Sequence, residues 1–288
     1  MAANSRCQLP LSTITAQGQP PIQQPGFLTY PDGSYKADGS VRAAPSTWSF
    51  DEALQRWVPA LLRYLSPDGR QYVADSTNGS ITIVDVATGR QTQLVTSGVA
   101  RVLGWANQGI VYVGQNGTRQ GIVLVDPQTR ASRELSVPVL LPQGRVHGDA
   151  LWVIGVDSST APILVRFDLT NGQSSIRYRF AQHTQSHSLP TFQGFDDLGN
   201  PLIVDAPSGL GSPFEVLVVT GIQKATTIYS GQATSTFRPA QQAVGDPRGI
   251  WMLGTDGSLW LYDAAHGLHS IPLPAGSPAI AALAGACK

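Results

Sequence analysis

The sequence predicts an all-β chain, a six-bladed β-propeller of four-stranded antiparallel blades. Three observations predict it. Short apolar runs alternate with turn sequences along the chain, the turns account for much of the 30 Gly and 21 Pro, and one phrase recurs at a regular interval. Four short strands in every 40–45 residues, approximately, are typical of propeller blades.

The clearest copy of the recurring phrase lies between Ile250 and Asp263. Two apolar runs flank a Thr-Asp-Gly-Ser turn, and an Asp follows the second run. Glycine adopts the positive φ that a tight hairpin turn requires, so this pattern predicts two antiparallel strands.

The strand-end aspartate sets the period of the repeat. Asp85, Asp126 and Asp168 stand 41 and 42 residues apart, and Asp263 follows 95 residues later, which spans two repeats. We expect each side chain to accept hydrogen bonds from the backbone of the turn that follows it, in preference to a metal or catalytic role.

Taken in order, the chain begins with an extended N-terminal arm over residues 1–25, which is rich in Gln, Pro, Ser and Thr and has no core of its own. A single propeller domain is expected over residues 26–288. Its complete four-strand units are predicted at 61–95, 102–135, 139–178, 191–229 and 241–272.

The sixth blade is expected to combine both ends of the chain. Residues 279–284 are predicted as its innermost strand, and the segments near Phe27, Trp48 and Trp57 as its outer three strands. Such closure removes exposed sheet edges. Five blades with a separate N-terminal hairpin remain the alternative.

The two cysteines, Cys7 and Cys287, stand at opposite ends of the chain. A disulfide joining them is favoured over two free thiols, because a closed ring of blades brings both ends together. A disulfide also indicates an oxidising compartment, so an extracytoplasmic or secreted location is expected. The start of the chain has no apolar signal segment, which fits a native cytosolic start or an expression leader equally.

Composition narrows the classes of partner. Nineteen basic and nineteen acidic residues cancel, and charged residues make up only 13% of the chain. A neutral chain without a Lys/Arg cluster argues against nucleic acid as a partner. No apolar run is long enough for a membrane span. A monomer that binds a protein or glycan ligand is expected.

Two stretches carry a family resemblance. The Ser-Pro-Asp-Gly turn at 66–69 and the phrase at 257–263 resemble bacterial propellers of the TolB-like, WD40-like and NHL-like group. The Cys-Gln-Leu-Pro opening and the Ala-Cys near the C-terminus are similar to exported, lipoprotein-type propellers. The resemblance covers about residues 26 to 288. It implies an architecture and transfers no catalytic residue, because propellers host many functions.

Loops around the expected channel mouth supply the candidate ligand-binding residues. His183 and His187 lie in one connection and are the candidates for a general base or a metal pair, although a solvated polar loop is the favoured interpretation. Arg119 and Arg238 are candidates for binding an anionic group of the ligand. Ser208, in a long loop, is a further candidate ligand-binding residue. No metal and no cofactor is predicted.

The favoured function is therefore a non-catalytic extracytoplasmic binding or protein-interaction module with its ligand site at the channel mouth. The alternative is a propeller enzyme, a lyase or hydrolase that acts on a polysaccharide or ester-like substrate with a channel-mouth His as its base.

Overall fold

A computed structural model describes residues 6–15, 22–41, 47–52, 54–74, 79–116, 119–136, 140–180, 189–205, 213–232, 239–273, 277 and 279–287. These residues form strands joined by short turns, and their one helical segment is the 3-10 turn η1, Leu62–Tyr64. The prediction of an all-β chain with antiparallel sheets is confirmed. No helix in these ranges is long and apolar enough to cross a membrane.

The chain divides into two compact units. Unit 1 contains Met1–Asp51, Gln55–Pro59 and Phe180–Lys288, and unit 2 contains Glu52–Leu54 and Ala60–Arg179. Each unit has its own buried apolar clusters and its own sheets.

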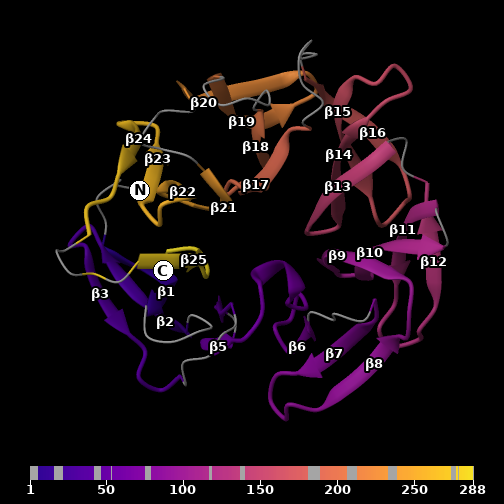
Figure 1. Ribbon diagram of the computed structural model, residues 1–288, viewed down its shortest axis with the longest axis horizontal. Coiled ribbons are helices and arrows are strands. Elements are labelled where there is room, and N and C mark those ends of the chain that lie inside the picture. The colour runs from indigo at the N-terminus through magenta and orange to yellow at the C-terminus, as the bar shows by residue number, and fades with distance from the viewer. Residues whose placement is uncertain are drawn as a thin grey trace. The chain divides into compact units, whose positions relative to one another are not determined.

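In unit 1, one four-stranded sheet combines both ends of the chain, in the order β25-β1-β2-β3 (Figure 1). Its strands are β25 (Ala279–Leu283), β1 (Cys7–Thr15), β2 (Ile22–Tyr30) and β3 (Ser34–Ala37). The sheet contributes Leu9 and Leu11 to a cluster with Trp251 and Leu259, so it packs against the strands that contain these two residues. The predicted pairing of both ends of the chain in one sheet is thus present, and a Cys7–Cys287 disulfide joins them, with Cα atoms 5.6 Å apart.

The strands of this sheet differ from the prediction in two ways. Residues 7–15, expected in an arm without a core, form β1, because alternate residues Cys7, Leu9 and Leu11 bury their side chains. The segments at Trp48 and Trp57 do not join the sheet. They form a separate two-stranded sheet of β4 (Ser49–Asp51) and β5 (Arg56–Val58), packed through Phe50 and Trp57.

The third sheet of unit 1 has eight strands, arranged as two four-stranded groups that are joined through their first strands. Gly194 pairs with Ala243 and Phe195 with Val244 in a short parallel ladder. A Cβ at Gly194 would overlap the Ala243 carbonyl, so glycine is needed for this approach. One group is β17 (Thr191–Phe195), β18 (Pro201–Asp205), β19 (Pro213–Gly221) and β20 (Lys224–Gln232), and the other is β21 (Pro239–Asp246), β22 (Gly249–Gly254), β23 (Leu259–Asp263) and β24 (Gly267–Ser270).

Unit 2 holds one three-stranded and two four-stranded antiparallel sheets. The first is β6 (Gln71–Ala74), β7 (Ile81–Asp85) and β8 (Gln91–Val95), preceded by η1 where the sequence predicts a strand at Leu61–Leu65. Only Leu65 of that stretch pairs with the sheet, opposite Tyr72. The others are β9 (Val99–Ala106), β10 (Gly109–Asn116), β11 (Arg119–Val125) and β12 (Ser132–Leu135), then β13 (Leu140–His147), β14 (Ala150–Val156), β15 (Pro162–Asp168) and β16 (Ser174–Arg179).

Candidate functional site

The strand-end aspartates occupy the same local geometry in four repeats. Asp85, Asp126, Asp168 and Asp263 each accept hydrogen bonds from the backbone N–H groups two and three residues later, at 2.7–3.2 Å. The predicted turn-capping role of this aspartate is confirmed. Because four copies share the geometry, any additional contact at one copy is specific to that repeat.

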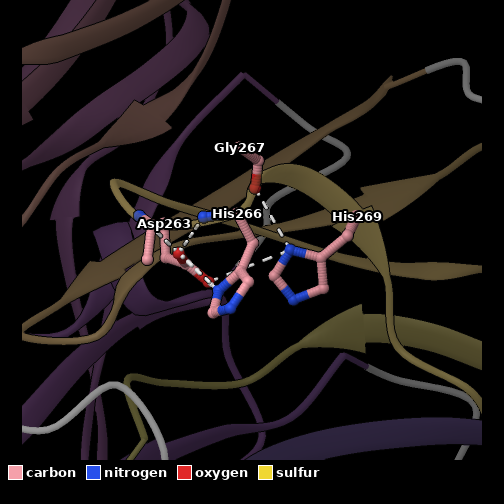
Figure 2. A network of polar contacts seen from close by, with 5 residues as sticks. Asp263, His266, Gly267 and His269 are labelled. Carbon is pink, nitrogen blue, oxygen red and sulfur yellow. Dashed lines mark hydrogen bonds and ion pairs between the residues drawn. The ribbon is translucent and has the colours of Figure 1, made fainter.

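Asp263 is the buried copy of the four, and it alone among them contacts histidine side chains in the described residues. It is only 4% exposed, and the Nδ1 atom of His266 lies 3.0 and 3.1 Å from its two carboxylate oxygens. Figure 2 shows that His269 also presents its Nδ1 atom toward this carboxylate, at 3.8 Å. That nitrogen lies 3.1 Å from the Gly267 carbonyl oxygen, and the two rings are 5.7 Å apart.

Two opposing effects act on the pKa of Asp263. Burial alone would raise it, but hydrogen bonds from the backbone N–H and ring of His266 and from the Ala265 N–H outweigh burial. The pKa therefore lies below its ordinary value, and the group stays ionised at neutral pH. The Asp263 charge in turn adds to burial in raising the pKa of Tyr30 in β2.

Asp246, at the end of β21, is a second buried carboxylate of the same repeat. One oxygen accepts from the Arg248 N–H at 2.7 Å, and the other accepts from Trp251 Nε1 at 2.7 Å and from the Cys287 N–H at 3.1 Å. Asp246 thus connects the β21–β22 turn to a core tryptophan and to the disulfide-bonded end of the chain.

A cavity of about 320 Å³ lies between the two four-stranded groups of unit 1. Its polar rim comes from the turns that join first to second strands and third to fourth strands. Its walls carry four carboxylates, one guanidinium and several apolar side chains, from Asp196, Asp197, Val218, Thr220, Thr226, Ile228, Asp246, Pro247, Arg248, Gly249, Ile250, Tyr262, Asp263 and Ala264.

The carboxylates in this wall are not equivalent. Asp246 and Asp263 are buried and satisfied by the bonds given above, and Asp196 accepts from the Leu198 and Asn200 N–H groups. Asp197 is exposed at the rim. The first three therefore shape the cavity, and Asp197 is the carboxylate that a bound molecule would meet in water.

Two large apolar side chains project into solvent from turns beside this cavity. Leu198, in the β17–β18 turn, is 81% exposed, and Ile222, in the β19–β20 turn, is 62% exposed. Both turns lie at the same edge of one sheet, because they join alternate pairs of antiparallel strands. Among the described residues, the only other exposed large apolar side chain is Leu62.

The sequence-predicted ligand residues cannot be placed around this cavity. His183, His187, Ser208 and Arg238 lie outside the described residues, and for Arg119 only its position as the first residue of β11 is described. The loops that hold Ser208 and Arg238 join strand ends opposite to the turns that line the cavity. The cavity is therefore at the other face of these sheets from the face favoured by the sequence.

The imidazoles next to Asp263 are not part of the cavity wall. The contact between Asp263 and His266 has the form of an oriented acid–base pair, yet neither His266 nor His269 lines the cavity. Within the described ranges, no three His, Cys, Asp or Glu side chains are arranged to hold a metal ion. The His266 ring instead contacts Asp263 at the turn, and the His269 ring contacts the Gly267 carbonyl.

Sequence reasoning did not find the Asp246 contacts. The sequence feature that could have indicated them is Asp-Pro-Arg-Gly at 246–249, which is typical of a tight turn that begins with an Asp. Trp251 follows this Asp by five residues. The pairing of Asp246 with the Cys287 N–H links residues 41 apart, and no local pattern predicts it.

No family model matches the chain, and no curated protein matches it. Among solved structures, TolB from Acinetobacter baumannii is 15% identical with a TM-score of 0.59, over 98% of this chain and 67% of that one. A putative TolB from Agrobacterium tumefaciens is 12% identical with a TM-score of 0.53, over 93% and 88%. A putative 6-phosphogluconolactonase from Bacteroides fragilis is 10% identical with a TM-score of 0.53, over 97% and 98%. At such identities these likenesses show the fold alone, the all-β propeller type of fold that TolB contains.

Proposed function

We propose that this chain is a non-catalytic, extracytoplasmic protein-interaction module built as a six-bladed β-propeller. Six successive groups of three or four antiparallel strands support the blade number: β6–β8, β9–β12, β13–β16, β17–β20, β21–β24 and the sheet that combines β25 with β1–β3. The last of these would be the blade closed by both termini. The Cys7–Cys287 disulfide supports an oxidising compartment.

The observation that carries the binding function is the exposed pair Leu198 and Ile222 beside the cavity in unit 1. Water-exposed Leu and Ile side chains at turn tips gain free energy when a partner covers them. The cavity beside these two side chains offers Asp197, Arg248 and backbone groups for polar contacts. Protein–protein interfaces combine apolar anchors, which the partner buries, with polar contacts at their rim.

Site-specific photo-crosslinking tests this proposal. Benzoylphenylalanine is placed at Leu198 or at Ile222 in the otherwise intact chain, in cells that produce it. The matched control is Gln128, which is exposed in the equivalent third-to-fourth-strand turn of β11–β12. We expect a crosslinked protein from positions 198 and 222 and none from 128. Equal crosslinking from all three positions, or from none, would contradict a specific interface at these turns.

The same experiment addresses the sequence-predicted face. Benzoylphenylalanine at Ser208 tests whether a protein ligand binds near Arg119, His183, His187 and Arg238. Crosslinking from 208 alone would move the interface to that face. The enzyme alternative predicts a different result: turnover of an ester or polysaccharide should disappear in the double variant His183→Ala, His187→Ala.

A further inference from the structure

Three arginines from three elements of unit 2 lie near one another. Arg63 is the central residue of η1, Arg101 lies in β9 and Arg145 lies in β13. The elements contact one another, and Gly104 in β9 permits the close approach. A Cβ at Gly104 would stand 2.8 Å from the Val146 Cβ and 3.4 Å from the Arg63 carbonyl oxygen. The three arginines therefore lie on elements that pack against one another at one junction.

The charges at this junction are of one sign. Burial first, and then the neighbouring Arg63 and Arg101 charges, lower the pKa of Arg145 to about 10, while Tyr64 acts in the opposite direction. Arginine is ordinarily the least easily perturbed of the basic side chains. Among the residues that the structure describes, no carboxylate contributes to the electrostatics of Arg145. The folded chain thus holds Arg145 among positive charges that raise the free energy of its ionised form.

The hydrogen-bonding capacity of the Arg63 guanidinium is not fully used. The Arg63 guanidinium lies over the Tyr64 ring, with Cζ 4.7 Å from the centroid and Nη2 3.4 Å from the hydroxyl oxygen. Its Nε is buried without an acceptor. Among the described residues, neither Arg63 nor Arg145 takes part in an ion pair. A planar guanidinium held in this way presents its N–H groups to an incoming anion.

We propose that Arg63, Arg101 and Arg145 form an anion-binding site for an acidic peptide segment. A carboxylate-bearing ligand offsets the repulsion among three guanidinium groups and accepts the bidentate hydrogen bonds that arginine offers. The exposed Leu62, next to Arg63 in η1, places an apolar contact beside the charge, which suits a peptide better than a free inorganic anion. This site belongs to unit 2 and is additional to the cavity of unit 1.

Calorimetric titration of the full oxidised chain tests the site. The probe is an acetylated, amidated peptide that alternates Glu and Leu, and the reference peptide has Gln at each Glu. Inorganic phosphate is titrated separately. We expect the Glu peptide to bind, with an affinity that falls as salt is added, and the Gln peptide and phosphate to bind at least tenfold more weakly. Equal binding of the Glu and Gln peptides, or tighter binding of phosphate, would overturn the proposal.

Variants locate the binding within the chain. Arg145→Gln and Arg63→Gln should each reduce affinity for the Glu peptide by about tenfold, the loss of one strong charged contact. Arg145→Lys keeps the charge but loses the planar fork and should give an intermediate loss. Arg90→Gln is the matched control, since it removes an exposed arginine of the same unit and should change affinity less than twofold. Equal losses in the Arg90 and Arg145 variants would overturn the site.

A second readout separates binding from folding. Without ligand, Arg145→Gln should raise the melting temperature, because repulsion and burial of charge are both relieved. A purely structural arginine would instead lower the melting temperature on replacement. Crosslinking at Leu198 and Ile222 does not depend on these arginines, so failure of this site leaves the interface of unit 1 standing.

Discussion

The strand groups β13–β16 and β21–β24 share one plan and differ in what lies at the strand ends. Each has a tryptophan at the same place in its second strand, Trp152 opposite Arg145 and Trp251 opposite Val244. At the end of the first strand, β13 has the exposed His147, whereas β21 has the buried Asp246. A position that faces water in one repeat is therefore a buried anchor in the other.

The third-strand ends show the same contrast. The side chain of Asp168 is 25% exposed and lies 3.6 Å from Arg166, while that of Asp263 is 5% exposed and bonded to His266. Both accept the same two backbone hydrogen bonds. Local turn chemistry is thus conserved between the repeats, and tertiary burial decides how much each aspartate contributes to stability. Substitutions at matched positions measure that difference.

The largest effect is expected from the Cys7–Cys287 disulfide, which adjoins the β21–β24 group where the Cys287 N–H binds Asp246. Replacing Cys7 and Cys287 by Ala removes a cross-link between residues 280 apart in sequence. The chain-entropy model gives about 5 kcal/mol for so long a loop, an upper value for measured bridges. Denaturant unfolding of the oxidised, reduced and double-Ala proteins measures it. A midpoint that does not change on reduction would remove the structural importance of the bridge.

The next effect is at the first strand end. Asp246→Ala leaves the Trp251 indole N–H and the Cys287 N–H without their acceptor in a buried place, and we expect a loss of about 3 kcal/mol. His147→Ala is its matched control in β13 and should change stability by less than about 0.5 kcal/mol. Urea unfolding of both variants gives the comparison. Similar losses would show that burial does not separate the two repeats.

Particular residues show how much of the structure could be predicted from the sequence. The alternation of apolar residues and Asp-Gly turns predicted most strands, and the spacing of Asp85, Asp126 and Asp168 predicted the turn geometry, because both depend on local contacts. The strand β1 was missed, since its Gln-, Pro- and Thr-containing sequence becomes a strand only through pairing with β25 and β2. The cavity and the arginine cluster combine residues from separate strand groups, whose approach no local pattern encodes.

A smaller effect separates the two third-strand aspartates. Asp263→Ala should cost about 1–2 kcal/mol at pH 7, because a buried carboxylate loses several hydrogen bonds, and Asp168→Ala should cost less. The pKa of Asp263 is lowered in the folded chain, so its contribution is complete above about pH 4 and declines as pH falls through the folded pKa. Stability curves from pH 2 to 7 should therefore converge for wild type and Asp263→Ala at low pH. A gap that does not depend on pH would contradict this assignment.

The smallest effect is expected at the imidazole itself. The side chain of His266 is 58% exposed, and its backbone N–H still binds Asp263 when the ring is removed. His266→Ala should therefore change stability by less than about 0.5 kcal/mol. A loss comparable to that of Asp263→Ala would mean that the ring, rather than the backbone, holds the carboxylate.

The sheet β25-β1-β2-β3 has a consequence for the order in which the chain acquires its structure. Its first three strands are among the earliest to be synthesised, while β25 follows every other strand. Until β25 arrives, one edge of β1 has no partner and is open to pairing with another chain. A nascent or newly exported chain would carry this open edge throughout synthesis, and the bridge between Cys7 and Cys287 can form only after it closes. Truncation just before β25 should therefore favour self-association rather than a slightly smaller monomer.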